Sequence, residues 1–298
     1  MTIDKIYINT HRYDLQLTRT CVASVRYWYP DIPIYLIVDY SNGAIPASGM
    51  CRKWNLKILD TGKQHYGWGF GKFEPLFLNH PERFLILDAD TVLTGPVLDK
   101  VKDLDADFVV DKEVQPFEKF TSLYYDPAKA AELFPGFRYP GYSFNTGQWI
   151  GKTKVLNRND FNDFVVWTPA PKLKYPEYFK QADQGIFNLL IHIKEEKQQV
   201  QVKKIPLMIW PENGNADFLQ FSSISQRTHE APYIIHWAGM KFSNLSGYPR
   251  ADILLFYETF FYSRYNFIER ILNKLMLRYL KIEKKIRFRL KRMGVIKK

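Results

Sequence analysis

Two aspartates one residue apart, Asp88 and Asp90, end the segment FLILDAD and are the residues of this chain most suited to chemistry. The four apolar residues before Asp88 are typical of a buried strand, so both carboxylates are expected at its end. Two carboxylates placed there can bind a hard divalent cation and leave positions open for phosphate oxygens. The segment therefore predicts a Mg²⁺ or Mn²⁺ site that acts on a diphosphate.

An Asp-x-Asp triplet is common by chance, so its surroundings decide its meaning. Asp103, Asp105 and Asp107 form two more triplets, but they lie in the charged stretch DKVKDLDAD and are predicted to be surface turn or strand-entry residues. For Asp88 and Asp90 the competing interpretation is a strand-end turn whose carboxylates bond to the backbone. On these residues alone, both interpretations stay open.

A second candidate segment, HWAGMK, holds His236, Gly239 and Lys241. A neutral imidazole can complete the coordination of an ion such as Mn²⁺, and a nearby ammonium can neutralise a leaving diphosphate. A histidine at a strand end before a glycine turn is also common in protein cores, so the segment is weak evidence alone. Together, the two segments supply the groups needed for metal-assisted departure of a nucleoside diphosphate.

The elements expected to position these residues alternate between strands and helices. Strands are predicted over KIYINT at 5–10 and at 32–39, 56–60, 83–90, 107–111, 142–151 and 233–239, and helices over 14–29, 71–80, 153–166 and 181–192. This alternation predicts an α/β fold with a mixed, mostly parallel sheet flanked by helices. Functional loops are expected at the carboxyl ends of the strands, where Asp39 and Asp60 also fall.

Composition limits the class of protein. The chain has 298 residues, 46% of them hydrophobic, which is enough for one large domain or two small ones. Its two cysteines, Cys21 and Cys51, favour a reducing compartment over a disulfide scaffold. The first residues lack an apolar stretch of signal-peptide length, and the longest apolar run, ILLFYETFFY, is too short to span a bilayer. A cytoplasmic protein is expected.

The positive charge lies in the C-terminal tail. Residues 264–298 hold 13 Lys and Arg against two Glu, which accounts for the whole net charge of +11 and leaves the body neutral. A neutral body argues against nucleic acid as a partner. Composition changes near residue 250, so we predict a catalytic domain over 1–250 and a basic helical extension over 251–298.

Apolar residues recur in this tail at spacings of three and four, which predicts a basic amphipathic helix. They are Ile268, Leu272, Leu275, Tyr279, Ile282, Ile286, Leu290 and Met293. Such a helix fits an anionic membrane surface, as expected for a peripheral membrane protein. It also fits a short coiled coil or packing against the body, and the tail could simply be solvated. These alternatives stay open.

Four segments in order, LILDADTVL, FNTGQWIG, ADQGIFN and HWAGMK, resemble glycosyltransferases of the GT-A fold. The likeness covers about residues 3–242 and is to the family of bacterial lipopolysaccharide galactosyl- and glucosyltransferases and glycogenin. It implies a Rossmann-like sheet and an enzyme that moves a hexosyl group from a nucleotide-sugar, a UDP-sugar, to a glycan or lipid-linked acceptor. It also implies Mn²⁺ or Mg²⁺ as cofactor, leans towards retention, and suggests lipopolysaccharide biosynthesis.

The resemblance also implies roles for individual residues. Asp88 and Asp90 match metal and ribose ligands, His236 the third metal ligand, and Gly239 and Lys241 diphosphate contacts. Thr10 matches the position that meets the base, Asp39 the acidic end of the next core strand, and Asn145 and Gly147 the segment facing the sugars. Asp183 and Gln184 match the pair near the anomeric carbon, as base in an inverting enzyme or as neighbours of the sugar in a retaining one.

The match has departures. Lys72 is the counterpart of a basic residue before the Asp-x-Asp strand, but its surroundings are unusual, and the proline and tryptophan that often follow Lys241 in the family are absent. Among the tryptophans, Trp149 is expected near a pocket. Two rival functions stay open. A sugar nucleotidyltransferase would need a glycine-rich loop where this chain has NTHRYDLQ, and a nucleotide-sugar-binding scaffold would bind without transfer.

Overall fold

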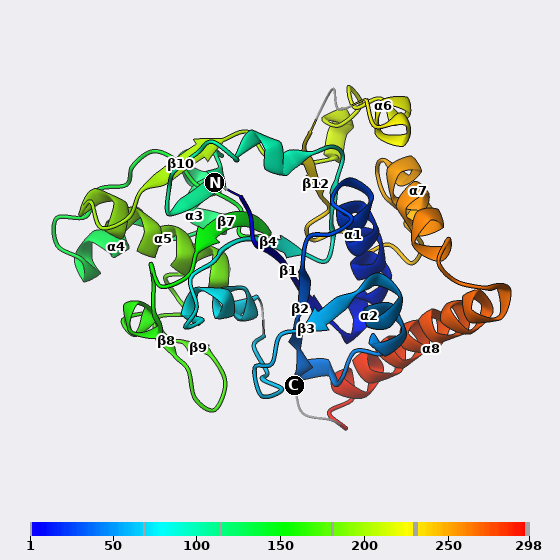
Figure 1. Cartoon of the computed structure of the whole chain (residues 1–298). Coiled ribbons are helices and arrows are strands. Elements are labelled where there is room, and N and C mark those ends of the chain that lie inside the picture. Colours follow the sequence, from blue (N-terminus) through cyan, green and yellow to red (C-terminus); the bar gives the residue numbers. More distant parts are fainter. Residues whose placement is uncertain (1, 68, 114, 180–181, 229–231, 296–298) are drawn as a thin grey trace.

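A seven-stranded sheet forms the centre of the molecule (Figure 1). The computed structural model describes residues 2–67, 69–113, 115–179, 182–228 and 232–295. The strand order is β10-β6-β7-β4-β1-β2-β3. In chain order these strands are β1 (Lys5–His11), β2 (Ile34–Asp39), β3 (Leu56–Ile58), β4 (Arg83–Asp88), β6 (Phe108–Asp111), β7 (Gln148–Lys152) and β10 (Val202–Ile205).

Only β7 runs against its neighbours in this sheet. It is antiparallel to both β4 and β6, whereas the other four pairings are parallel. The predicted mixed, mostly parallel sheet is therefore confirmed. Parallel strands end at one edge, so the carboxyl ends of β1, β2 and β4 meet there and bring their loops together.

Two smaller sheets complete the strands. β5 (Thr91–Leu93), β11 (Met208–Ile209) and β12 (Ile234–His236) form one, in the order β11-β12-β5. β8 (Val165–Val166) and β9 (Lys172–Leu173) form the other. The three-stranded sheet begins one turn after β4, so it extends the fold directly beside the Asp-x-Asp segment.

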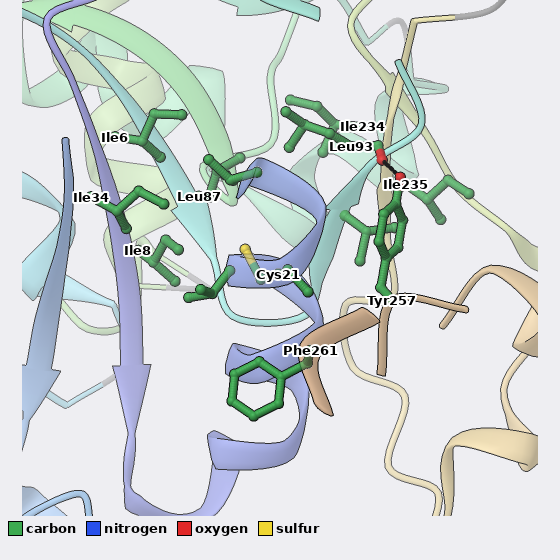
Figure 2. Packing of buried hydrophobic residues seen from close by; sticks show 14 of the residues in the cluster. Ile6, Ile8, Cys21, Ile34, Leu87, Leu93, Ile234, Ile235, Tyr257 and Phe261 are labelled. Atoms are coloured by element: carbon green, nitrogen blue, oxygen red, sulfur yellow. Dashed lines mark hydrogen bonds between the residues drawn. The ribbon is translucent and has the colours of Figure 1, made fainter. Parts of the chain in front are cut away.

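Each face of the main sheet has its own buried core. Alternation along β1 sends Ile6 and Ile8 to one face and Tyr7 to the other. The first face packs on α1 (Leu15–Trp28), α2 (Ser48–Trp54) and α7 (Ala251–Tyr262). Figure 2 shows Cys21 of α1 between strand residues and Phe261 of α7. The opposite face packs on α3 (Phe117–Leu123), α4 (Pro127–Leu133) and α5 (Ala182–Glu196).

Two predicted helices are wrong in extent or type. Residues 71–80 form instead a 3₁₀ helix over Phe70–Phe77, with Pro75 inside it. Residues 153–166 contain only the short 3₁₀ helix Arg158–Phe161 before β8 begins. The helix predicted over 181–192 is confirmed by α5, and the one over 14–29 by α1.

The C-terminal residues form α7 and the 26-residue α8 (Phe267–Arg292), after the short α6 (Phe221–Gln226). α7 buries Ile253, Leu254 and Tyr257 in the core that α1 shares, whereas α8 buries only Leu277 and Leu280 among its residues. The basic helical extension is thus present as α8. The boundary at residue 250 stays a prediction. Among the described residues, no helix combines the length and apolar character that crossing a bilayer requires.

Candidate active site

The pairing of β5 with β12 brings the two candidate metal segments together. β4 ends at Asp88, the chain turns through Ala89 and Asp90, and β5 then runs antiparallel to β12 with Thr91 opposite His236. The backbone N–H of Trp237 donates to the carbonyl oxygen of Asp90 at 3.0 Å. His236 is therefore held beside the Asp-x-Asp turn although 146 residues separate it from Asp90.

The three side chains converge. Ligand atoms of Asp88, Asp90 and His236 all lie within 4.8 Å of one another, and Nε2 of His236 lies 3.2 Å from Oδ1 of Asp90. Burial raises the pKa of Asp88 against the opposing charges of Lys72 and His236. Burial acts the same way on Asp90, but the charge and hydrogen bond of His236 outweigh it and hold the pKa of Asp90 below its usual range.

A buried lysine links this cluster to α5. Nζ of Lys72 lies 3.2 Å from Oδ2 of Asp88 and 2.8 Å from Oδ2 of Asp183, in the first turn of α5. Thr146 donates its hydroxyl to the same Asp183 oxygen at 2.8 Å. Burial disfavours the charged ammonium, but Asp183 and Asp88 outweigh this, so the pKa of Lys72 is raised. One cation therefore joins two carboxylates from different elements.

The backbone around this ion pair leaves no spare room. At Gly69, which has φ +89°, a Cβ would lie 2.6 Å from Oδ2 of Asp183 and 2.8 Å from Cε of Lys72. Only glycine fits this position and adopts this conformation without strain.

The segment before β7 contacts both α5 and the end of β4. Asn145 donates its amide to Oε1 of Gln184 at 2.9 Å, and its own oxygen accepts from the N–H of Gly147 at 2.7 Å. The carbonyl of Gly147 accepts from the N–H of Asp88 at 2.7 Å. The structure thus brings Asn145, Gly147, Asp183 and Gln184 to the same edge as Asp88.

Other predicted site residues lie nearby with partners of their own. Thr10 is buried and shares a hydrogen bond of 2.6 Å with the hydroxyl of Thr18 in α1. Asp39 accepts from the N–H groups of Tyr66 and Gly67, and so ties that loop to the end of β2. Base or ribose contacts for Thr10 and Asp39 stay predictions.

Gly239 and Lys241 follow β12 in an exposed turn. Gly239 has φ +74° and open space around it, and Lys241 is exposed. Their contacts with a diphosphate stay predictions.

Trp149 is the exception among the predicted residues. Its indole is 0% exposed and packs against Phe84, Phe108 and Phe187 in the core under α5. The side-chain alternation of β7 turns it into the sheet interior. The buried indole therefore makes no contact with the protein surface in this structure, and the expectation that Trp149 lies near a pocket stays a prediction.

Several solved glycosyltransferases share this fold. The bifunctional glycosyltransferase WbbM matches with a TM-score of 0.52 and 15% identity over 88% of this chain, which spans about half (52%) of WbbM. The galactosyltransferase LgtC, solved with donor and acceptor sugar analogues, matches with a TM-score of 0.51 and 15% identity over 86% of this chain and 95% of its own. An active-site mutant of LgtC gives 0.52 at 13% identity.

This chain has the GT-A glycosyltransferase fold. The predicted resemblance is thereby confirmed at the level of the fold. No protein-family model matches the sequence, and no curated protein matches it.

The side chains of Asp88, Asp90 and His236 offer ligand atoms that suit a divalent ion. Two carboxylates and one imidazole are a ligand set that Mn²⁺ accepts and that leaves positions for phosphate oxygens. Gly147 makes the necessary room, because a Cβ there would clash with Cε1 of His236. The residues present therefore fit the ion that the sequence predicts.

Sequence reasoning missed three residues that lie in or beside the candidate site. Thr146 donates to Asp183, Trp210 stacks on the ring of His236, and Glu113 accepts a hydrogen bond from Trp210. Thr146 lies between two predicted residues, so its position was a usable clue. Trp210 and Glu113 carry no recognisable spacing, because strand pairing alone brings them to the site.

Proposed function

We propose that this protein is a metal-dependent glycosyltransferase that moves a hexosyl group from a UDP-sugar to a glycan or lipid-linked acceptor. The observation that supports it is the convergence of Asp88, Asp90 and His236 beside the Lys72–Asp183 pair, at the carboxyl edge of a GT-A sheet. Each group has a use in the departure of a nucleoside diphosphate. A bacterial surface glycan such as lipopolysaccharide is the expected product class.

In this proposal Asp88, Asp90 and His236 would hold the cation. When bound, Mn²⁺ or Mg²⁺ supplies positive charge that stabilises the diphosphate as its bond to the sugar breaks. Lys241, exposed in the turn after β12, adds a second positive charge for the diphosphate. Lys72 balances Asp88 and Asp183, so the negative cluster keeps its geometry without the donor.

The contacts of Asp183 favour retention. Its Oδ2 already accepts from Lys72 and Thr146, so a proton taken there would weaken a buried ion pair. In this proposal Asp183 orients groups around the donor sugar and does not take the acceptor proton. Gln184, held by Asn145, lies one residue along α5 and faces the same edge. The acceptor proton then passes to a phosphate oxygen of the donor on the face that the diphosphate leaves.

Thermal stabilisation by candidate donors tests this proposal first. Purified protein is heated with UDP, GDP, CMP and UDP-hexoses, each with Mn²⁺ or with EDTA. We expect one uridine ligand to raise Tm only with Mn²⁺, and Asp90→Asn to abolish that shift. Asp103→Asn, an exposed aspartate of the other triplets, is the matched control and should respond like wild type.

Two other results would redirect the proposal. No shift with any nucleotide would remove the support for a donor site at Asp88 and Asp90. A metal-dependent shift without sugar transfer or donor hydrolysis, against a broad acceptor set, would favour a nucleotide-sugar-binding scaffold. If transfer occurs, the anomeric configuration of the product, read by NMR, tests retention directly.

We further propose that α8 seats the enzyme on an anionic membrane, at the inner face and in the cytoplasm. One side of α8 packs on the body, and the rest exposes apolar residues beside exposed Lys and Arg. The exposed apolar residues are Phe267, Ile268, Ile271, Leu272, Leu275, Met276, Tyr279, Ile282, Ile286 and Phe288. Such a face combines insertion into the headgroup boundary with attraction to anionic lipid.

Sedimentation with phosphatidylglycerol-containing vesicles tests the membrane surface. We expect binding that weakens with added salt and is lost when Leu272, Leu275 and Ile282 are replaced together by Gln. Ile58→Gln, at an exposed position of β3, is the control and should bind like wild type. Self-association of the full chain that the triple variant abolishes, without vesicle binding, would instead identify α8 as a contact between copies.

A further inference from the structure

The indole of Trp210 covers one face of the proposed metal ligand His236. Trp210 follows β11, which pairs in parallel with β12, so the two side chains leave neighbouring strands at the same level. Their ring centroids are 5.2 Å apart and their planes differ by 20°, which is a stacked arrangement. Trp210 is half-buried.

The imidazole of His236 also lies against Gly147. A Cβ at this position would clash with Cε1 and lie 2.8 Å from Nδ1 of His236. The ring is therefore in close contact with both the backbone at Gly147 and the indole of Trp210. Two surfaces limit its rotation, and Nε2 is left facing Asp88 and Asp90.

His236 lacks the usual hydrogen bond that orients a metal-bound imidazole. Such a ligand normally donates its second ring nitrogen to a carboxylate or carbonyl oxygen. Nδ1 of His236 is buried and, within the described part of the chain, has no hydrogen-bond partner. Packing must therefore orient the imidazole of His236, as a hydrogen bond does for other metal-bound histidines.

Trp210 is itself held by Glu113. Its indole N–H donates to Oε1 of Glu113 at 3.0 Å, and Oε2 of Glu113 accepts from the hydroxyl of Tyr124 at 2.5 Å. The backbone of Glu113 exchanges two hydrogen bonds with Ser143, two residues before Asn145. Glu113 thus fixes the indole relative to the segment that carries Gly147.

We propose that Trp210, anchored by Glu113, is a positioning residue that sets the plane of His236 for divalent metal binding. This rests on the proposed function, because it takes Asp88, Asp90 and His236 as the metal site. The indole acts through the imidazole and does not itself touch the ion. Its loss should weaken metal binding even without nucleotide or sugar.

Direct Mn²⁺ binding tests this inference without any turnover. Free Mn²⁺ is measured by electron paramagnetic resonance for the full chain and for a matched pair of variants. Trp210→Phe keeps an aromatic face over His236 and should bind within a few-fold of wild type. Trp210→Leu keeps an apolar cover without a flat face and should bind about 10- to 100-fold more weakly. A purely structural cover would give both variants the same affinity.

The anchor is tested in the same assay. Glu113→Leu leaves the indole N–H without its acceptor and should weaken Mn²⁺ binding in the same direction as Trp210→Leu. Glu113→Gln keeps an oxygen that accepts from the indole and should restore most of the affinity. Equal affinities for Leu and Gln at this position would remove Glu113 from the proposal.

Fluorescence gives an independent readout of the stack. A paramagnetic ion bound through His236 should quench the indole stacked on it, so Mn²⁺ should quench wild type more than Trp210→Phe. A quench of the same size in both proteins would contradict the stacked arrangement. This comparison also shows whether the Phe variant still folds, from the emission of its other tryptophans.

Asp90→Asn separates this inference from the proposed function. If Asp90→Asn abolishes Mn²⁺ binding while Trp210→Leu binds as tightly as wild type, the metal site stands and the positioning role is overturned. If wild type binds no Mn²⁺, or Asp90→Asn binds it unchanged, the metal site fails and the positioning role fails with it. Weaker Mn²⁺ binding by both Asp90→Asn and Trp210→Leu, with binding retained by Trp210→Phe, supports both the metal site and the positioning role.

Discussion

Buried Lys72 is the cation between the partly exposed Asp88 and the buried Asp183, and its removal predicts a large loss of stability. Its Nζ contacts Asp88 and Asp183, and truncating one partner of a buried ion pair leaves charge uncompensated. We expect Lys72→Met to lower the free energy of unfolding by about 3 kcal/mol in EDTA. Urea denaturation measures this, and Mn²⁺ should restore part of the loss by replacing one positive charge.

The control for Lys72 is a surface lysine. Lys152 pairs with Asp105, whose side chain is 76% exposed, so Lys152→Met should cost less than about 1 kcal/mol. Similar costs for both lysines would show that burial does not strengthen the Lys72 pair.

The close approach of Gly147 to His236 predicts that one added methyl group at this position weakens metal binding. Gly147→Ala must displace His236 or β7, because the new Cβ meets the imidazole. We expect Mn²⁺ affinity to fall by about tenfold or more, with a smaller change in Tm than in affinity. Isothermal titration with Mn²⁺ measures it, and wild-type affinity would mean that the ring moves aside without cost.

Buried His192 predicts a loss of stability in mild acid. Its Nδ1 lies 2.6 Å from the Tyr125 hydroxyl, and burial, assisted by Lys204, lowers its pKa from 6.5 to about 3. The unfolded chain binds the proton near pH 6.5 and the folded chain only near pH 3, so this stability is present above pH 6.5 and falls as pH drops towards 3.

Between pH 7.5 and 5.0 the loss from His192 amounts to about 2 kcal/mol. Urea denaturation at both pH values should show it in wild type and a correspondingly smaller loss in His192→Gln. The same pH dependence in both proteins would mean that His192 titrates normally in the fold.

The residues found from sequence and those missed differ in one physical respect. Asp88, Asp90 and His236 combine a reactive side chain with a strand end, and both properties are visible in the chain itself. Trp210 and Glu113 meet only because β11, β12 and the Glu113–Ser143 bridge fall in register. The opposite holds for Trp149. Its segment lies at the site, but strand alternation turns its side chain into the core.

At the scale of elements, α5 must pack closely against its neighbours to place Asp183 and Gln184 at the candidate site. A Cβ on Gly185, the next residue, would clash with the backbone oxygen of Tyr124, which cannot move as a side chain could. Gly185→Ala should therefore shift the first turn of α5, cost about 1–3 kcal/mol, and lower kcat about 100-fold. Gly49→Ala in α2, where a Cβ meets nothing within 4 Å, should leave activity unchanged and stabilise slightly.

These two variants are compared by urea denaturation and by donor hydrolysis with Mn²⁺. A fully active Gly185→Ala protein would show that α5 tolerates displacement, and its residues would then need no exact placement.

Element prediction succeeded where periodicity was long and failed where it was short. α1 and α5 run for 14 and 15 residues, long enough for a repeated buried face to stand out. The segment 153–166 has a capping box at Asn157, which starts a helix, but the chain leaves the helical path after Phe161. Only tertiary pairing of β8 with β9 marks the change, and local sequence does not contain it.

At the scale of the whole molecule, α7 and α8 differ in both charge and burial. The net charge of +11 resides in residues 264–298, and α8, with ten Lys and Arg against two Glu, carries +8 of it. It is held to the body by Leu277 and Leu280 and by Arg12, which donates from Nε and Nη2 to Glu283 at 3.0 and 2.9 Å. α7, by contrast, is part of the core beneath β5 and α1 (Figure 2).

This difference predicts two classes of stability among the C-terminal helices. Local opening requires exposing whatever a segment buries, so α7, with Ile253, Leu254 and Tyr257 in the core, should open only with the whole sheet domain. α8 exposes little apolar surface when it detaches, and its like charges repel one another, so it should open more readily. Hydrogen exchange of the full chain measures both.

We expect α7 amides to exchange with the slowest strands of the sheet and most α8 amides to exchange at least tenfold faster. Within α8, residues 277–283 should be the best protected, because the buried leucines and the contact with Arg12 lie there. Added anionic vesicles should then slow exchange along the exposed face of α8 and leave α7 unchanged. Exchange of α7 and α8 as one fast unit would instead place the boundary of the catalytic domain near residue 250, before α7, as composition predicts.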